Sequence, residues 1–391
     1  MEAKIEEVAS ILVKSLNITT LKPEHVKIQR MIGFSNEVYK VVISDDIKCP
    51  HLKSNTMMLK QKINEKPNAD YILLGKEVPE FLKKHRFGAL NIFEDEDIVI
   101  EEFIPSTTCK RDDFKNAECF FQVLRQVAEY GKLFKDHADE LQVHNVGKTL
   151  ISIIIEKGIV EKSIQNLKKV LGSENSTVNK NDVLRILNWI EKEALTDDVK
   201  KVIDEANKLP LMVCHNDFYW LNVLNKDEGG YLLIDYEYTA FNPIGWDIAN
   251  YYTERNFHFD EKANVFTYYK NLPGIGERSL VYKYYLLCLD DKFDHNTPVD
   301  TQLMFDLAQG KYDSMIDLDL LDRLVDHASF VKLLLMVNLQ WIYFNCVMLD
   351  DDPTWPIIQY TFYRIELHMY LIKALESHGD HPPANDRRIS I

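Results

Sequence analysis

The 391-residue sequence predicts an α+β fold of two lobes, a small one rich in strands and a larger one that is mostly helical. Short β-branched and apolar runs separated by turns dominate residues 1–103, whereas apolar residues recur at helical spacing through most of 104–376. In the middle of the chain two short apolar runs each end on an aspartate. Residues 377–391 are polar and contain proline, which indicates a disordered tail.

The small lobe is expected to open with a helix and to contain five strands and a second helix. Ile5, Val8, Leu12 and Leu16 fall on one helical face, which predicts a helix over residues 3–16. The strands are expected at 25–32, 37–43, 56–61, 90–93 and 98–103, and the second helix at about 70–85.

The larger lobe is expected to be built mainly of helices. Apolar residues keep a 3.6-residue period from about 112 to 208, interrupted by a polar loop at 172–182. Residues 260–325 carry many tyrosines and are also expected to be helical.

Composition and charge exclude several classes of function. The excess of 61 acidic over 46 basic residues gives a net charge of −15, which disfavours nucleic acid or an anionic membrane as the main partner. The six cysteines form no CxxC pair, so we expect reduced thiols in a cytoplasmic protein. The first residues lack a signal-peptide pattern, and the longest apolar run, Leu333–Val337, is too short to span a bilayer. No integral membrane association is therefore expected.

The central stretch places acidic side chains after two short strands. Leu211–Cys214 leads into His215-Asn216-Asp217, and Asn222 follows Asp217 by five positions. Tyr231–Ile234 leads into Asp235-Tyr236-Glu237, and the intervening residues 226–230 have the composition of a hairpin turn. Two strands that each end on a carboxylate can hold a divalent cation and leave one carboxylate free to accept a proton.

These residues match what phosphoryl transfer requires. The reaction depends on positioning and on neutralising phosphate charge, for which Mg²⁺ with hard oxygen ligands is suited. Asp217 would accept the proton of the attacking hydroxyl, Asn222 and Asp235 would bind Mg²⁺, and Glu237 would reach a second metal directly or through water. A single aspartate after a strand is more often a turn former or a helix cap, but four residues at this spacing and a second hairpin outweigh that interpretation.

The motifs HNDxxxxN and IDYEY, followed by N-x-x-G-W-D-I-A-N at residues 242–250, resemble the choline/ethanolamine kinase family. Aminoglycoside phosphotransferases and other small-molecule kinases of this fold share the shorter pair HxDxxxxN and ID but lack the third motif. The resemblance implies a protein-kinase-like fold, an active site between the lobes, and ATP-dependent phosphorylation of the hydroxyl of choline or ethanolamine. That reaction is the first step of the CDP-choline and CDP-ethanolamine routes to phospholipids. Asp247 would orient the catalytic turn, and family analogy adds a possible homodimer.

The resemblance also implies a nucleotide site in the small lobe. The turn after the first strand would close over the phosphates, and a strand lysine would contact the α- and β-phosphates, paired with a glutamate of the following helix. Backbone groups of the segment leaving the sheet would bind adenine. The residues assigned to these roles are Gly33, Ser35 and Asn36, then Lys60 paired with Glu77, and then Glu102 to Ile104. Lys62 and Glu80 remain the alternatives for the ion pair.

For the cationic head of the substrate, the resemblance implies an acidic residue and aromatic walls. Glu254 would face the ammonium group, and Tyr238, Trp341 and Tyr360 would surround it. A first tryptophan of the family pattern falls on Asn338, which is a departure. Trp355 or Tyr343 would replace the lost ring, or the pocket would be more polar and suit a primary ammonium. Asn338→Trp would then shift preference towards choline.

Two other functions fit parts of the pattern. One is another small-molecule kinase of the same fold, acting on an aminoglycoside or on methylthioribose, against which the third motif argues. The other is a nucleotide-binding pseudokinase, which would need a missing catalytic residue, whereas Lys60, Asp217, Asn222 and Asp235 are all present.

Overall fold

The computed structural model describes residues 2–31, 36–47, 54–62, 77–89, 91–95, 97–140, 148–174, 178–260, 263, 265–290, 293–294, 296–349 and 356–376. The chain divides into two compact units. The first contains helices α1 and α2 and a five-stranded sheet, and the second contains the chain from Thr108 onward apart from a short turn at 226–229. The α+β fold expected from the sequence is confirmed.

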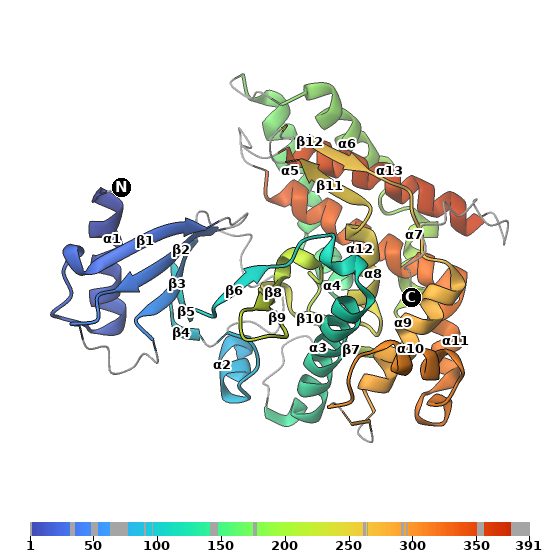
Figure 1. The fold of residues 1–391 in the computed structure, drawn as a ribbon. Helices are drawn as coiled ribbons and strands as arrows, with labels where there is room; N and C mark the ends of the chain where they lie inside the picture. The colour runs from blue at the N-terminus through green and yellow to red at the C-terminus, as the bar shows by residue number, and fades with distance from the viewer. Residues whose placement is uncertain are drawn as a thin grey trace. The chain divides into compact units, whose positions relative to one another are not determined.

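The first unit is an antiparallel sheet with a helix against one face (Figure 1). Its strand order is β1-β2-β3-β5-β4. Val8 and Leu12 of α1 pack with Val41 and Ile100 of the sheet, and all four are buried. The elements are α1 (Glu2–Leu16), β1 (Val26–Met31), β2 (Asn36–Ile43), β3 (Thr56–Lys62), α2 (Glu77–Lys84), β4 (Asn91–Glu94) and β5 (Ile98–Glu102).

The expected first helix and five strands of this unit are present, and each of their ends differs from the prediction by at most one residue. The second helix, expected at about 70–85, is described from Glu77 to Lys84, and residues 70–76 lie outside the described residues. The agreement follows from the alternation of apolar residues, since the inward-facing positions of β3, Met57 and Leu59, are both 0% exposed.

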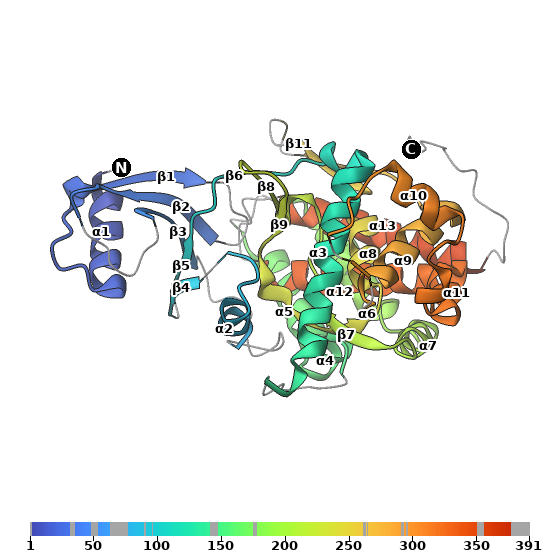
Figure 2. The same ribbon diagram turned by 60° about the horizontal axis from the view of Figure 1, so that its bottom comes forward.

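The second unit is built around one helix, α12 (His327–Val347), against which α13 (Ile357–Glu376) and α8 (Trp246–Glu254) pack (Figure 2). This helix is long and apolar enough to cross a membrane, yet 94% of its most apolar window is buried inside the protein. A helix that is apolar on all sides is expected in a core. The other helices are α3 (Ala117–Asp136), α4 (Leu150–Glu156), α5 (Ile159–Gly172), α6 (Lys180–Lys192), α7 (Asp197–Ala206), α9 (Ile275–Cys288), α10 (Thr301–Ala308) and α11 (Leu318–Val325).

The central stretch forms short strands, as expected. The hairpin of β8 (Val223–Lys226) and β9 (Tyr231–Leu233) is joined by β6 (Ser106–Thr108) in a three-stranded sheet. The strand β7 (Leu211–Cys214) pairs instead with β10 (Ala240–Pro243), which the sequence did not predict.

The expectation of helix throughout residues 260–325 is wrong at its start. An antiparallel hairpin, β11 (Phe257–Asp260) and β12 (Val265–Tyr268), lies there. Phe257 faces Tyr268 with ring centroids 6.2 Å apart, and Phe259 faces Phe266 at 4.8 Å. Aromatic residues at alternate positions are the signal of a strand, and these cross-strand pairs stabilise the hairpin.

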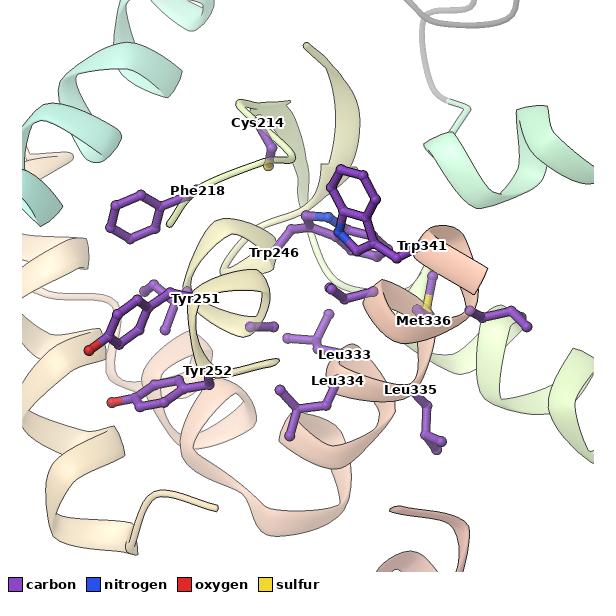
Figure 3. Packing of buried hydrophobic residues seen from close by; sticks show 14 of the residues in the cluster. Cys214, Phe218, Trp246, Tyr251, Tyr252, Leu333, Leu334, Leu335, Met336 and Trp341 are labelled. Carbon is purple, nitrogen blue, oxygen red and sulfur yellow. The ribbon is translucent and has the colours of Figure 1, made fainter. Parts of the chain in front are cut away.

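The start of α8 is fixed by tight packing. Trp246 is 0% exposed and belongs to the same apolar cluster as Leu333 and Leu334 of α12 (Figure 3). Gly245 precedes it with φ 88°, and a Cβ there would lie 2.9 Å from the Tyr282 ring. Only glycine suits both the conformation and the space, so the direction of α8 is set by Gly245, which precedes the helix, and by Trp246, its first residue.

Candidate active site

A tight turn presents Asp217 immediately after β7. The backbone N–H groups of His215 and Asn216 donate to the two carboxylate oxygens of Asp247, at 2.9 Å and 2.7 Å. Asn216 has φ 68°, a left-handed conformation that asparagine tolerates. Burial raises the pKa of Asp247 to about 6, against the two hydrogen bonds that lower it. Asp247 therefore orients the turn, as the resemblance implied.

His215 ties this turn to the end of β9. Its Nε2 lies 2.8 Å from the Ile234 carbonyl oxygen, and its Nδ1 accepts the backbone N–H of Asp217 at 3.2 Å. Burial lowers the pKa of His215 to about 4, so the ring is neutral and donates from Nε2 only. Because Ile234 precedes Asp235, one imidazole fixes the backbone beside both aspartates.

Asn222 completes the link between the two segments. Its Nδ2 donates to the Asp217 carbonyl oxygen at 2.8 Å and to Asp217 Oδ2 at 2.7 Å. Its own carbonyl oxygen accepts the Ile234 N–H at 2.9 Å. Because the side-chain nitrogen is engaged in these two hydrogen bonds, Oδ1 is the side-chain atom that could bind a metal. Mg²⁺ prefers oxygen ligands.

Negative charge is concentrated around Asp217. Burial raises the pKa of its carboxyl group well above the usual range, and the charges of Asp235, Glu254 and Glu237 raise it further, against the hydrogen bond from Asn222. Asp235 itself has φ 67°, a left-handed conformation that aspartate, like asparagine, adopts more readily than most residues. Hard oxygen donors at an acidic site fit a divalent cation, which would relieve the repulsion between their charges.

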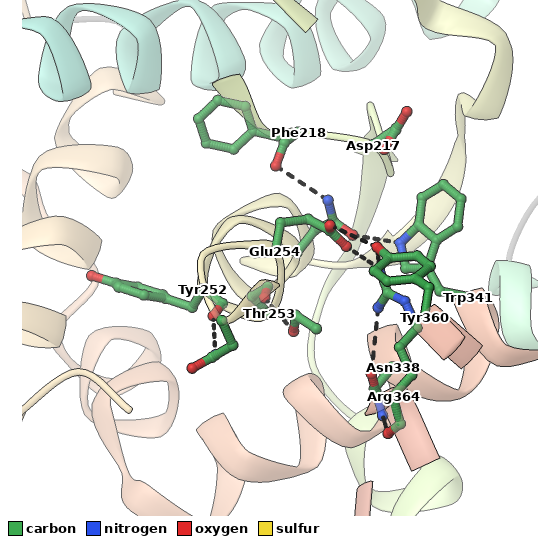
Figure 4. A network of polar contacts seen from close by, with 12 residues as sticks. Asp217, Phe218, Tyr252, Thr253, Glu254, Asn338, Trp341, Tyr360 and Arg364 are labelled. Atoms are coloured by element: carbon green, nitrogen blue, oxygen red, sulfur yellow. Dashed lines mark hydrogen bonds and ion pairs between the residues drawn. The ribbon is translucent and has the colours of Figure 1, made fainter. Parts of the chain in front are cut away.

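One face of α8 connects this turn to a second acidic region. Asp247, Asn250 and Glu254 are spaced by three and four residues and so share that face. Asn250 Nδ2 donates to the Phe218 carbonyl oxygen at 3.1 Å, and its Oδ1 accepts the indole N–H of Trp341 at 2.8 Å (Figure 4). The helix therefore joins the residue after Asp217 to a tryptophan of α12.

The residues expected to bind a cationic head lie together at the end of α8. The Tyr360 hydroxyl donates to Glu254 Oε2 at 2.9 Å, and the rings of Tyr238 and Trp341 meet edge to face with centroids 5.2 Å apart. Arg364 also contacts Glu254 (Figure 4). Glu254, Trp341 and Tyr360 are each 8% exposed.

Asn338 does not line a pocket left open by a missing ring. It is 0% exposed and contacts Arg364, so a tryptophan at this position would have to displace the arginine. Of the two residues considered as replacements, Tyr343 is also 0% exposed and Trp355 lies outside the described residues.

The small-lobe assignments are described in part. Lys60 of β3 forms an ion pair with Glu101 of β5 at 3.1 Å. Glu102 ends β5, and the carbonyl oxygen of Ile104 accepts the Ser106 hydroxyl at 2.8 Å. Gly33, Ser35 and the side chains of Asn36 and Glu77 lie outside the described residues.

Three residues have a clear role in the structure of the site but were given no role in the sequence analysis. His215 and Asn250 belong to the motifs at 215–222 and 242–250, and Arg364 lies four residues after Tyr360 on the same helix. Their positions in those motifs were the available signal, but their roles depend on which backbone groups they meet in the folded chain.

Comparison with known proteins identifies the family. A model of the family "Choline/ethanolamine kinase" matches residues 28–366. "Probable choline kinase 2" of Arabidopsis thaliana is 25% identical over 226 residues, which are 57% of each chain. "Probable ethanolamine kinase" of the same plant is 23% identical over 245 residues, 61% of this chain and 58% of that protein. The alignments thus span a little over half the length of these relatives.

A solved structure confirms the fold. The choline kinase of Cryptosporidium parvum is 16% identical, with a TM-score of 0.63 and coverage of 96% of this chain and 97% of that one. The two-lobed, protein-kinase-like fold expected from the resemblance is confirmed. Because the family match covers most of the sequence, from the first strand of the sheet into the last helix, the chain belongs to the choline/ethanolamine kinase family.

Proposed function

We propose that this protein transfers the γ-phosphoryl group of ATP to the hydroxyl group of choline or ethanolamine, giving the phosphorylated alcohol and ADP. One observation carries the proposal: His215 and Asn222 fix Asp217 beside the strand end that bears Asp235. Phosphoryl transfer needs such an arrangement of a proton acceptor and metal-binding oxygens.

Asp217 is the proposed catalytic residue. One carboxylate oxygen orients the substrate hydroxyl and receives its proton as the hydroxyl oxygen bonds to the γ-phosphorus. The bond from that phosphorus to the β-γ bridging oxygen breaks, and ADP leaves. The raised pKa of Asp217 supports this role, because a carboxylate with a higher pKa is a stronger base.

Asn222 and Asp235 are the residues that would hold Mg²⁺, and Glu237 would reach a second ion directly or through water. When bound, the metal would neutralise charge on the transferred phosphate. The negative charges of Asp235, Glu237 and Glu254, which act on Asp217, support a cation at this place.

On the nucleotide side, we propose that Lys60 contacts the α- and β-phosphates while Glu101 holds its ammonium group. Backbone groups from Glu102 to Ile104 would bind adenine. The assignments of Gly33, Ser35, Asn36 and Glu77 stay predictions from the resemblance.

On the acceptor side, Glu254 faces the ammonium group, and Tyr238, Trp341 and Tyr360 form the walls of its site. The contact between the Tyr238 and Trp341 rings supports a shared site, and so does the guanidinium group of Arg364, which lies over both the Trp341 and the Tyr360 rings. We also propose a cytoplasmic enzyme that acts as a homodimer, by analogy with the family.

A substrate panel tests the proposal. ADP release is measured with Mg·ATP and, separately, choline, ethanolamine, methylthioribose and an aminoglycoside. Turnover is expected with an amino alcohol and is expected to be lost in Asp217→Asn. The matched control is Asp227→Asn, an exposed aspartate of the β8–β9 turn. Turnover only with another acceptor, or none with any acceptor, would contradict the proposal.

A further inference from the structure

A cation of the chain already occupies the region expected to bind the cationic head. Arg364 is 0% exposed, and its Nη2 contacts both Glu254 Oε1 and the Tyr360 hydroxyl. The centre of its guanidinium group lies 4.4 Å from the centroid of the Tyr360 ring, 4.9 Å from that of Phe257 and 5.6 Å from that of Trp341. Two of these three rings, those of Tyr360 and Trp341, were expected from the sequence to surround the substrate.

Asn338 fixes this arginine through both ends of its amide group. Its Nδ2 donates to the Arg364 carbonyl oxygen at 2.5 Å, and its Oδ1 accepts from Arg364 Nη1 at 3.3 Å. Asn338 lies on α12 and Arg364 on α13, so the amide joins the two helices at the level of Glu254. Because the backbone and the guanidinium group are held by one residue, the arginine side chain has a defined direction.

This arrangement changes what Glu254 can offer a substrate. The ion pair with Arg364 is buried and electrically balanced, so the carboxylate attracts an external cation much less than an isolated carboxylate would. A carboxylate has about four lone-pair positions. In the described part of the chain, Tyr360 and Arg364 each use one oxygen, which leaves a lone pair on each oxygen for further N–H donors.

Resting on the proposed function, we infer that Asn338 and Arg364 determine the substrate class. The site selects an amino alcohol whose ammonium group donates hydrogen bonds over one whose nitrogen carries charge alone. A primary ammonium has three N–H donors for Glu254, whereas a quaternary ammonium has none and depends on charge and aromatic faces. Both residues act through Glu254 and are therefore positioning residues.

A graded series of acceptors tests the inference on the unaltered protein. The acceptors are ethanolamine, N-methylethanolamine, N,N-dimethylethanolamine and choline, and kcat/KM is measured for each with saturating Mg·ATP. We expect kcat/KM to fall as N–H donors are lost, by about tenfold or more at the last step, since a hydrogen bond to a charged group is lost there. A value for choline equal to or above that for ethanolamine would overturn the inference.

A substitution tests the role of the amide. Asn338→Leu has nearly the same size and removes both amide contacts. In the described structure Arg364 is then held beside Glu254 only by its polar contacts with Glu254 and Tyr360. The ratio of kcat/KM for ethanolamine to that for choline is expected to narrow by about fivefold or more, on the scale of one lost hydrogen bond. The control is Asn345→Leu, which removes another buried asparagine of α12 and is expected to leave the ratio unchanged.

The ratio of the two kcat/KM values distinguishes a change in specificity from a loss of folded protein, because partial unfolding lowers kcat/KM for ethanolamine and for choline equally. An unchanged ratio in folded Asn338→Leu would overturn the inference, and if that variant does not fold the graded series alone decides. Phosphorylation of choline in preference to ethanolamine would overturn the inference and leave the proposed function standing. Phosphorylation of none of the four alcohols would overturn both.

Discussion

The turn that carries Asp217 and the end of α8 that carries Glu254 are both acidic, but they balance their charge differently. Asp217 is surrounded by other carboxylates, and in the described part of the chain no lysine or arginine forms an ion pair with it. Glu254 has the guanidinium group of Arg364 against it. The same helix supports both regions, through Asp247 at one end and Glu254 at the other.

The difference indicates how each region recognises a ligand. Several carboxylates that act on one another favour a cation from solution, and this fits the proposed metal site. A carboxylate that already has a counter-ion gains less from another charge and more from hydrogen bonds. Removing a charge should therefore have opposite effects on stability at the two places.

The largest expected effect is on activity at Asp217. Asp217→Asn is expected to lower kcat by about 10²–10⁴-fold, because the proton acceptor is lost. The melting temperature should not fall, because the substitution removes one of several crowded negative charges. Steady-state kinetics and a thermal melt measure both. A variant with a lower melting temperature and a normal kcat would contradict the assignment of Asp217 as the proton acceptor.

At Glu254 the expected effect is on stability. Glu254→Gln leaves the buried guanidinium of Arg364 without its partner and should lower the free energy of unfolding by about 3–5 kcal/mol. Urea unfolding measures this. The control is Glu277→Gln, whose ion pair with Arg255 at 2.7 Å is partly exposed and should lose about 1 kcal/mol or less. Equal losses of unfolding free energy in the two variants would mean that the buried Glu254–Arg364 pair contributes no more to stability than the partly exposed pair.

One turn beyond Arg364, His368 shows what happens to a buried basic group without a counter-ion. Burial lowers its pKa to about 4, and both ring nitrogens lack a hydrogen-bond partner in the described structure. Below pH 6.5 His368 binds a proton in the unfolded chain but stays neutral in the folded chain until the pH approaches 4. The free energy of unfolding therefore falls as the pH drops from about 6.5 to about 4. The contribution is about 3 kcal/mol at most. His368→Leu should reduce this pH dependence, and identical stability curves from pH 7 to 4 would contradict it.

The smallest effect is expected at Tyr360. Tyr360→Phe removes the hydroxyl contacts with Glu254 Oε2 and with Arg364 Nη2 but keeps the ring and the ion pair. The loss should be about 2 kcal/mol in unfolding free energy, the usual value for two hydrogen bonds. A loss as large as that of Glu254→Gln would show that the hydroxyl, and not Arg364, balances the carboxylate.

Much of this arrangement was predictable from the sequence. Alternating apolar residues predicted the five strands, and the motif spacing predicted that Asp217, Asn222 and Asp235 belong together. The β11–β12 hairpin was missed because residues 260–325 were predicted to be helical as a whole, and the alternation of aromatic residues at the start of this range was not recognised as the pattern of a strand. The role of Arg364 could not be derived, because no local pattern shows that a residue 110 positions after Glu254 in the chain will meet it in the core. Asn338 was recognised as a departure, but its contact with Arg364 depends on how α12 and α13 pack.

The most direct test of the account concerns the cation at the Asp217 region. Mn²⁺ binding is measured by electron paramagnetic resonance with a nonhydrolysable ATP analogue, in the wild type, in Asp235→Asn and in the control Asp227→Asn. The account predicts that Asp235→Asn weakens Mn²⁺ binding by about tenfold or more, as loss of a charged ligand should, while the control binds like the wild type. Equal Mn²⁺ affinity in all three proteins would contradict it.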